Sequence, residues 1–320
     1  MRYSVIVPVY NRPREIDELL DSLTQQTFKS FEVIVVEDGS SIPCKSVVDK
    51  YSEKLNVSYF LKENSGQGFS RNFGFKKASG DYFVVFDSDC LIPAHYFDAV
   101  NNAMTRQKID CWGGPDRAHS SFTPIQKAIN YSMTSFLTTG GIRGGSRRVD
   151  TFHPRSFNMG ISEEVYQRTG GYKITRMGED LEFSIRIQKY GFKTVLIDKA
   201  YVFHKRRTNL LQFYKQLRFF GRARINLARF HPEQIKIIHS LPLVFTIGLS
   251  VIFMALIFSI SYLYFIIYLY GLFILIIAVD SFRHEKSLLI SFYAVIAGFI
   301  QLTAYGIGFF RELIRVKKRD

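Results

Sequence analysis

Cysteine is scarce in this sequence of 320 residues. The three cysteines, Cys44, Cys90 and Cys111, cannot all pair, and their spacing fits no zinc site such as C-x-x-C. A disulfide framework is therefore not expected, which suits a reducing cytosol. The first apolar stretch, in "MRYSVIVPVYNRP", is interrupted at Pro8 and is too short for a signal peptide, so it predicts a first strand instead.

Charged side chains are missing from two long stretches near the C-terminus. Residues 240–279 are forty consecutive residues without one, and residues 288–310 are another twenty-three. A spanning helix needs about 20 apolar residues, because each rises about 1.5 Å through a hydrocarbon core about 30 Å thick. We therefore predict two to three transmembrane spans, with a helical hairpin buried in a soluble domain as the alternative.

Acidic residues are outnumbered, since 42 Lys and Arg against 28 Asp and Glu leave a net charge of +14. Nine of the basic residues fall within 205–239, just before the first apolar stretch, and "RELIRVKKRD" follows the last one. Basic residues that flank spans mark the cytoplasmic side and attract anionic lipids. The pattern predicts a lipid bilayer, and not nucleic acid, as partner.

The same charges predict a multi-pass protein of the plasma (inner) membrane whose N-terminal domain lies on the cytoplasmic side. A basic cytoplasmic tail would then require an even number of crossings, whereas the apolar lengths suggest three. Either one segment lies shallowly in the membrane or the tail is outside.

Strand and helix patterns alternate through the first two hundred residues. β-Branched runs predict strands at 3–9, 32–37, 57–61 and 81–87, with helices between them. Such alternation builds an α/β domain with a mostly parallel central sheet, which binds ligands outside the carboxyl ends of its strands. The glycine-rich stretch 138–148 predicts a mobile loop. We divide the chain into an α/β domain (1–208), a basic interfacial helical segment (209–238) and a transmembrane region (239–320).

Two carboxylates follow the apolar run of the fourth strand in "VVFDSDCLIP". In an extended chain Asp87 and Asp89 point the same way, so their like charges share a small space. A divalent cation relieves this repulsion, and Mg²⁺ or Mn²⁺ takes carboxylate oxygens while a phosphate of the substrate completes its shell. The alternative is a polar turn that caps the next helix.

Four separated blocks together carry a resemblance. They are "SVIVPVYNRPREIDELLDSLTQQTFKSFEVIVVEDGSS", "GQGFSRNFGFKKASGDYFVVFDSDCLIP", "FNMGISEEVYQRTGGY" and "GEDLEFSIRIQKYGF". In this order, over roughly residues 1 to 205, they resemble a family 2 glycosyltransferase of the membrane-anchored bacterial type. The resemblance implies a GT-A type fold that binds a nucleotide sugar, followed here by C-terminal transmembrane helices.

The resemblance also implies roles for particular residues. Asp38 would recognise the base of the nucleotide, although an ordinary turn before Gly39 is the alternative. Arg71 would approach the nucleotide or its diphosphate, or be an exposed helical arginine. Asp87 would face the ribose or the metal, and Asp89 would bind the metal.

Glu179 and Asp180 follow a glycine at the start of a predicted helix, where acids are also favoured by the helix dipole. The resemblance implies that Glu179 lies beside the nucleotide sugar and that Asp180 is the general base, which accepts the proton of the acceptor hydroxyl. His204 would be a third metal or diphosphate contact, or else a partly exposed histidine of no such role.

The function expected from the resemblance is inverting, metal-dependent transfer of one sugar from a UDP- or GDP-sugar, with Mn²⁺ or Mg²⁺, to a lipid-linked or glycan acceptor in cell-surface glycan biosynthesis. Processive synthases of this family carry Gln-x-x-Arg-Trp, whereas "QLRFFGRAR" stands here, which favours single transfer. The alternatives are a sugar-phosphate nucleotidyltransferase, a processive polysaccharide synthase and a non-catalytic membrane module that binds nucleotide sugars.

Overall fold

The computed structural model describes residues 1–139, 152–261 and 264–317, so the predicted loop at 138–148 lies outside the described residues from position 140 onward. The chain divides into two compact units. The first is Met1–His119 with Asp150–Lys205, and the second is Ser120–Val149 with Arg206–Asp320. Residues 120–139 therefore belong with the C-terminal helices, although they lie within the first two hundred residues.

A seven-stranded sheet forms the centre of the described part of the first unit, with the order β3-β2-β1-β4-β8-β6-β9. Neighbours pair in parallel except for β8, which runs antiparallel to both β4 and β6. The strands are β1 (Tyr3–Val9), β2 (Phe31–Asp38), β3 (Val57–Lys62), β4 (Tyr82–Phe86), β6 (Cys111–Gly113), β8 (Asn158–Ser162) and β9 (Thr194–Leu196). The predicted α/β class with a mostly parallel sheet is confirmed.

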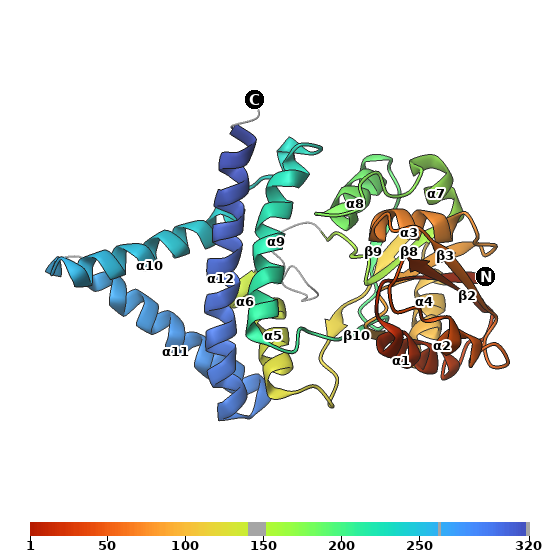
Figure 1. Ribbon diagram of the computed structural model, residues 1–320, viewed down its shortest axis with the longest axis horizontal. Coiled ribbons are helices and arrows are strands. Elements are labelled where there is room, and N and C mark those ends of the chain that lie inside the picture. The colour runs from red at the N-terminus through yellow and green to blue at the C-terminus, as the bar shows by residue number, and fades with distance from the viewer. Residues whose placement is uncertain (140–151, 262–263, 318–320) are drawn as a thin grey trace. The chain divides into compact units, whose positions relative to one another are not determined.

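Helices cover both faces of this sheet (Figure 1). Side chains alternate along a strand, so Val5 and Val7 of β1 pack toward one set of helices and Ile6 packs toward the other. The first set is α1 (Pro13–Thr24), α2 (Lys45–Asp49) and α4 (Tyr96–Met104), and the second is α3 (Gln67–Phe75), α7 (Glu163–Thr169) and α8 (Glu179–Lys189). Burial on both faces explains why these strands are almost wholly apolar.

A second, three-stranded sheet joins distant parts of the first unit. β10 (Val202–His204) pairs antiparallel with β5 (Cys90–Leu91) and parallel with β7 (Asp116–Arg117). In this register His204 stands opposite Cys90. The pairing thus brings the end of the unit beside the segment that follows β4.

The second unit is helical in its described part. It contains α5 (Pro124–Thr134), α6 (Phe136–Thr139), α9 (Leu210–Ala228), the 3₁₀ turns η1 (Pro232–Gln234) and η2 (Ile237–Ser240), α10 (Leu241–Ile257), α11 (Phe265–Glu285) and α12 (Leu288–Lys317). Apolar side chains of α5, α9 and α12 share one cluster. Three segments, Ile237–Ile257, Phe265–Glu285 and Leu288–Arg315, are long and apolar enough to cross a membrane.

Close packing in the sheet depends on a glycine in β8. A Cβ atom added to Gly160 would lie 2.0 Å from the indole of Trp112, which is fully buried. We expect Gly160→Ala to lower the free energy of unfolding by about 1–3 kcal/mol, because neither ring nor sheet has room to move. Denaturant unfolding in detergent, followed by the emission of Trp112, the only tryptophan, measures this change.

The matched control is Gly271→Ala in α11, where no atom lies within 4 Å of the added Cβ. It should leave the unfolding curve of Trp112 unchanged. Equal stability of Gly160→Ala and the unsubstituted chain would contradict the packing described for β8.

Candidate active site

Asp38 ends β2 and is buried, with a relative exposure of 4%. Its carboxylate accepts hydrogen bonds from the backbone N–H groups of Ser65 (2.9 Å) and Gly66 (2.8 Å) and from Lys62 Nζ (2.6 Å). Burial alone would raise the pKa of Asp38, but these donors outweigh it and lower the pKa. The ionised carboxylate thus fixes the turn that leads into α3.

Arg71 of α3 connects three separate segments. Its side chain is buried, and its Nη2 atom lies 2.7 Å from Asp87 Oδ1, directly after β4. Its Nη1 atom lies 3.4 Å from Glu179 Oε1, at the start of α8, while the guanidinium sits 5.4 Å from the ring centre of Tyr172. The exposed helical arginine that the sequence left open is therefore not what the structure contains.

The charges in this group depend on one another. Burial works against the charge of Arg71, but the carboxylates of Asp87 and Glu179 outweigh it and raise the pKa of Arg71. Burial and the negative charge of Asp180 raise the pKa of Glu179, while Arg71 and a hydrogen bond from Gln67 oppose that rise. A buried cation of this kind is stable only because both acids remain in place.

Asp180 lies in the first turn of α8, after Gly178 in the left-handed region at φ 98°. Its Oδ1 accepts from the N–H of Leu181 at 2.8 Å, and its Oδ2 lies 3.4 Å from Arg155 Nη1. About 23% of the side chain is exposed, whereas Glu179 is almost completely buried. Of the two acids, Asp180 is the more accessible to solvent or a ligand.

Asp89 has cationic or imidazole neighbours on both oxygens. Its Oδ2 accepts a hydrogen bond from Arg12 Nη1, and its Oδ1 lies 3.2 Å from His204 Nε2. His204 Nδ1 is 3.9 Å from Asp116 Oδ2. Burial would raise the pKa of Asp89, but His204 and Arg12 lower it well below its usual range. The carboxylate is therefore ionised beside an imidazole.

The atoms of Asp89, Cys90 and His204 that could ligate a metal lie within 4.8 Å of one another. Asp89 Oδ1 is buried and, within the described part of the chain, accepts no hydrogen bond of regular geometry, although His204 Nε2 lies 3.2 Å away. A carboxylate and an imidazole suit Mn²⁺, so this donor pair fits a divalent cation. Burial raises the pKa of Cys90 well above its usual value, and its thiol donates to the Phe157 carbonyl at 3.6 Å, which makes it a packing residue.

A continuous chain of contacts joins most of the residues singled out from the sequence. Asp38 accepts from Gly66, the neighbouring Gln67 donates to Glu179, and Arg71 bridges Glu179 to Asp87. Asp180 follows Glu179 in the chain and Asp89 follows Asp87 by two positions. The group lies at the carboxyl edge of the parallel strands, where ligands bind in open α/β sheets.

Sequence reasoning missed four side chains that complete this group: Arg12, Lys62, Gln67 and Arg155. Arg12 lies three positions after the end of β1 and Lys62 is the last residue of β3, so the rule that ligands meet the carboxyl ends of strands could have found both. Gln67 and Arg155 lie on segments whose proximity to the acids arises only from the tertiary fold.

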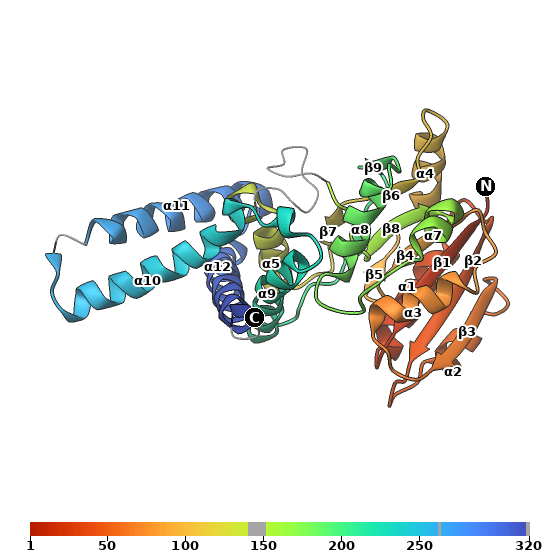
Figure 2. The same cartoon turned by 90° about the horizontal axis from the view of Figure 1, so that it is seen from above.

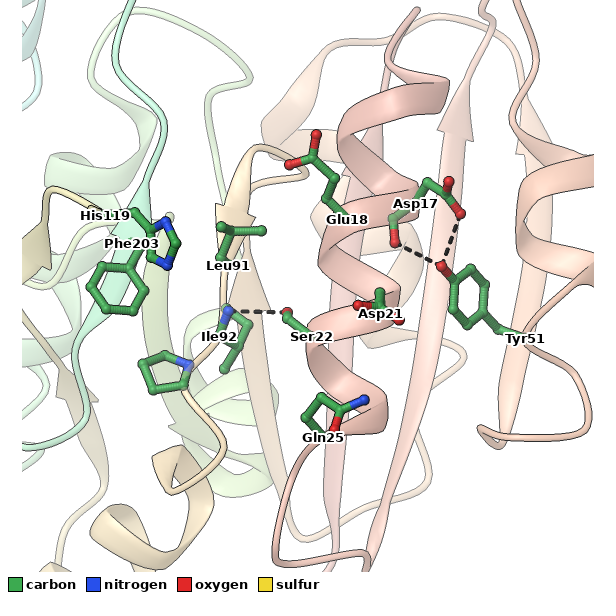
Figure 3. Close-up of a pocket in the computed structure, with 11 residues that line it drawn as sticks. Asp17, Glu18, Asp21, Ser22, Gln25, Tyr51, Leu91, Ile92, His119 and Phe203 are labelled. Carbon is green, nitrogen blue, oxygen red and sulfur yellow. Dashed lines mark hydrogen bonds between the residues drawn. The ribbon is translucent and has the colours of Figure 1, made fainter. Parts of the chain in front are cut away.

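A pocket of about 670 Å³ lies elsewhere in the first unit, beside α1 and β5 (Figure 3). Asp17, Glu18 and Asp21 of α1 line one side of it, and His119 and Phe203 line the other. Asp17 accepts a hydrogen bond from the Tyr51 hydroxyl at 2.9 Å, and Glu18 pairs with Lys205. This pocket contains none of the predicted site residues and is not the site assembled around Arg71.

Solved structures share this fold. A mannosyltransferase from Pyrobaculum calidifontis in complex with GDP-Man and Mn²⁺ aligns with a TM-score of 0.53 at 20% identity, covering 71% of this chain and 64% of that one. Residues 1–349 of TarS from Staphylococcus aureus in complex with UDP-GlcNAc align with a TM-score of 0.50 at 23% identity, covering 71% and 67%. Because both sequence identities are below 25%, the similarity shows a shared fold and no more.

Sequence relatives extend the comparison. An uncharacterized glycosyltransferase of Haemophilus influenzae is 44% identical over 220 residues, which are 65% of this chain and 70% of the relative. Poly(ribitol-phosphate) beta-N-acetylglucosaminyltransferase TarS of Staphylococcus aureus is 44% identical over 96 residues, 29% of this chain and 17% of TarS. An uncharacterized glycosyltransferase of Rickettsia bellii is 40% identical over 90 residues, only 13% of its length.

The family model "Glycosyl transferase family 2" matches residues 4–169, more than half of the chain and most of the unit that holds the Arg71 group. With the relative from Haemophilus influenzae, this match identifies the chain as a member of glycosyl transferase family 2.

Proposed function

We propose that this chain is an inverting, metal-dependent glycosyltransferase that moves a single sugar from a nucleoside-diphosphate sugar to a lipid-linked acceptor. The observation that carries the proposal is the group of Asp87, Arg71, Glu179 and Asp180, which joins the end of β4 to the start of α8 in a family 2 chain. It provides a reachable carboxylate, Asp180, next to a rigid and buried ion-pair network.

The donor is proposed to lie along this network. Asp38 would meet the base, Arg71 and Asp87 the diphosphate and ribose, and Glu179 the sugar. The GDP-Man and UDP-GlcNAc in the two structures of similar fold support a nucleoside-diphosphate sugar, either a UDP- or a GDP-sugar. Asp38 and Arg71 are held by several partners each, so they can contact a ligand without a rearrangement of their own side chains.

Asp180 is the proposed general base. Its carboxylate would accept the proton of the acceptor hydroxyl while that oxygen forms a bond to the anomeric carbon and the bond from this carbon to the nucleoside diphosphate breaks. A single displacement of this kind inverts the configuration at the anomeric carbon. The hydrogen bond from the N–H of Leu181 and the nearby Arg155 hold the carboxylate in one orientation, which proximity catalysis requires.

Asp89 and His204, with Asp87 on the adjoining turn, would hold the cation, Mn²⁺ or Mg²⁺. When bound, such an ion neutralises the charge that develops on the departing diphosphate. Arg12 holds the second oxygen of Asp89, so that Oδ1 stays directed toward His204. The Mn²⁺ in the similar mannosyltransferase structure supports a divalent ion at this kind of site.

The membrane segments support an acceptor that is itself held in the bilayer. An enzyme anchored by apolar helices can reach a lipid-linked hydroxyl without releasing it into water. We place the catalytic unit on the cytoplasmic side of the plasma (inner) membrane, where the basic flanks of the spans predict it. Incubation with labelled nucleotide sugars and a lipid extract tests the function: sugar in the lipid fraction supports it, and absence of transfer with every donor contradicts it.

Replacement of the base gives the first test of a single residue. Asp180→Asn keeps the shape of the side chain but cannot accept the proton, so kcat should fall by about 10²–10⁴-fold. Binding of the nucleotide, measured by calorimetry, should stay within about twofold. A variant with near-normal turnover would remove Asp180 from this role.

Glu164→Gln is the matched control, because Glu164 also lies in the first turn of a helix, α7, and is exposed there. If the acids of α8 served only the helix dipole, the two substitutions would have similarly small effects on turnover. We expect Glu164→Gln to leave kcat unchanged.

Metal dependence can be tested at Asp89 and His204. Chelation should abolish transfer and Mn²⁺ or Mg²⁺ should restore it, while Asp89→Asn and His204→Gln should each weaken Mn²⁺ binding by at least tenfold in an EPR titration. Cys90→Ser, at the neighbouring packing residue, should bind Mn²⁺ as before. Full activity in metal-free buffer, or unchanged Mn²⁺ affinity in both variants, would refute the assignment.

A further inference from the structure

The third apolar helix, α12, packs side by side with the basic helix α9, as both views show (Figures 1 and 2). Leu217 of α9 and Ala304 of α12 belong to one buried cluster. The two backbones approach so closely that a Cβ atom on Gly221 would lie 2.1 Å from the carbonyl oxygen of Tyr305. Further along, Arg222 Nε pairs with the buried Glu312 at 2.9 Å. α9 therefore accompanies α12 through the middle of the candidate span and on toward its C-terminal end.

The positive charge of α9 restricts the depth at which α9 and α12 can lie in a membrane. Four basic residues lie within α9, namely Lys215, Arg218, Arg222 and Arg224. Lys215 is exposed and stands two positions before Leu217, which packs near the centre of the segment 288–315. If α12 crossed the membrane, Lys215 would be carried close to the depth of the bilayer centre and Arg218 into the hydrocarbon core, where charged side chains are strongly unfavourable.

α10 and α11 are much less buried than α12. Only 6% and 11% of their apolar windows are buried, against 39% for α12. α10 contacts α12 through its first turns, where a Cβ on Gly306 would lie 2.5 Å from the Pro242 carbonyl. α11 contacts α12 through its middle and C-terminal half, where the ring centre of Phe273 lies 6.0 Å from that of Phe299 and Ile277 shares a cluster with Ala294. Figure 1 shows the two helices leaving α12 and converging at their far ends, where large apolar side chains such as Phe253, Ile257 and Leu269 are exposed.

We propose that α10 and α11 alone enter the hydrocarbon core, as a helical hairpin, and that α12 lies with α9 in the headgroup layer of the same membrane face. The candidate spans Ile237–Ile257, which includes α10, and Phe265–Glu285, which is α11, have 21 residues each, or roughly 32 Å at about 1.5 Å per residue, enough for the apolar core.

The distribution of charge agrees with this arrangement. The connection between α10 and α11, "FSISYLY" at 258–264, contains no charged residue. Every Lys and Arg from 205 onward then lies on one side of the membrane, including Arg283 at the end of α11 and the tail that follows α12. With three crossings, Arg311, Arg315 and the basic tail would lie on the side opposite to α9. The hairpin therefore resolves the conflict between an even number of crossings and three apolar segments.

A comparison of two cysteine variants tests the proposal. Arg283→Cys and Arg315→Cys lie at exposed positions before α12 and near its C-terminal end, and the natural cysteines Cys44, Cys90 and Cys111 are all buried. Sealed right-side-out and inside-out membrane vesicles are treated with a membrane-impermeant maleimide. We expect both variants to label from the same face, the one that exposes the catalytic unit. Labelling from opposite faces would show that α12 crosses and would overturn the proposal.

A depth measurement provides a second test that does not depend on access by the reagent. Phe292, Thr303 and Phe310 of α12 are spaced by eleven and seven residues, so they share one helix face. Tryptophan is placed at each in turn, and quenching by lipids brominated at different depths is recorded in reconstituted vesicles. Equal, shallow depths for all three support a helix in the headgroup layer. A much deeper position for Thr303→Trp than for the other two would contradict it.

Discussion

The first unit depends on a buried positive charge. Arg71 is held between Asp87 and Glu179, and neither acid belongs to the helix that carries it. A buried guanidinium without its partners costs several kcal/mol, so the end of β4 and the start of α8 must stay together for α3 to keep its position. This requirement makes the edge of the sheet rigid where a donor and an acceptor would have to meet. Asp180 gains its fixed position as the neighbour of Glu179.

Backbone pairing between strands positions the proposed metal ligands. β10 pairs with β5, so that His204 stands beside the segment of Asp89 although 115 positions separate the two residues in the sequence. Arg12, which follows β1, holds the other side of Asp89. In the second unit, close backbone contact between α9 and α12 and the ion pair of Arg222 with Glu312 hold these two helices together. Both units thus use contacts between segments distant in the chain to position polar side chains.

The strands β1 to β4 and most helices of the first unit could be predicted from the sequence, because their apolar periodicity matches a sheet buried on both faces. Asp38 could be found because it ends β2, and Asp87 and Asp89 because they closely follow β4. Lys62 ends β3 and lies opposite Asp38 in the strand register, so the same rule could have found it. Gln67 and Arg155 could not be found, since their meeting with the acids depends on how α3 and α8 pack. α5 ends at Thr134, where Ser135 adopts an extended conformation, and α6 begins at Phe136. The packing of α9 along α12 relies on glycines, which carry no hydropathy signal.

In the proposed function a nucleotide sugar and a divalent cation bind at the edge of the sheet, on either side of Asp87. An experimental structure of the chain with Mn²⁺ and a non-hydrolysable nucleotide sugar, with the anomalous signal of the metal recorded, tests this directly. We expect a metal peak in contact with Asp89 and His204 and the diphosphate next to Arg71. Metal and nucleotide in the pocket lined by Asp17 and Phe203, away from Asp180, would contradict it.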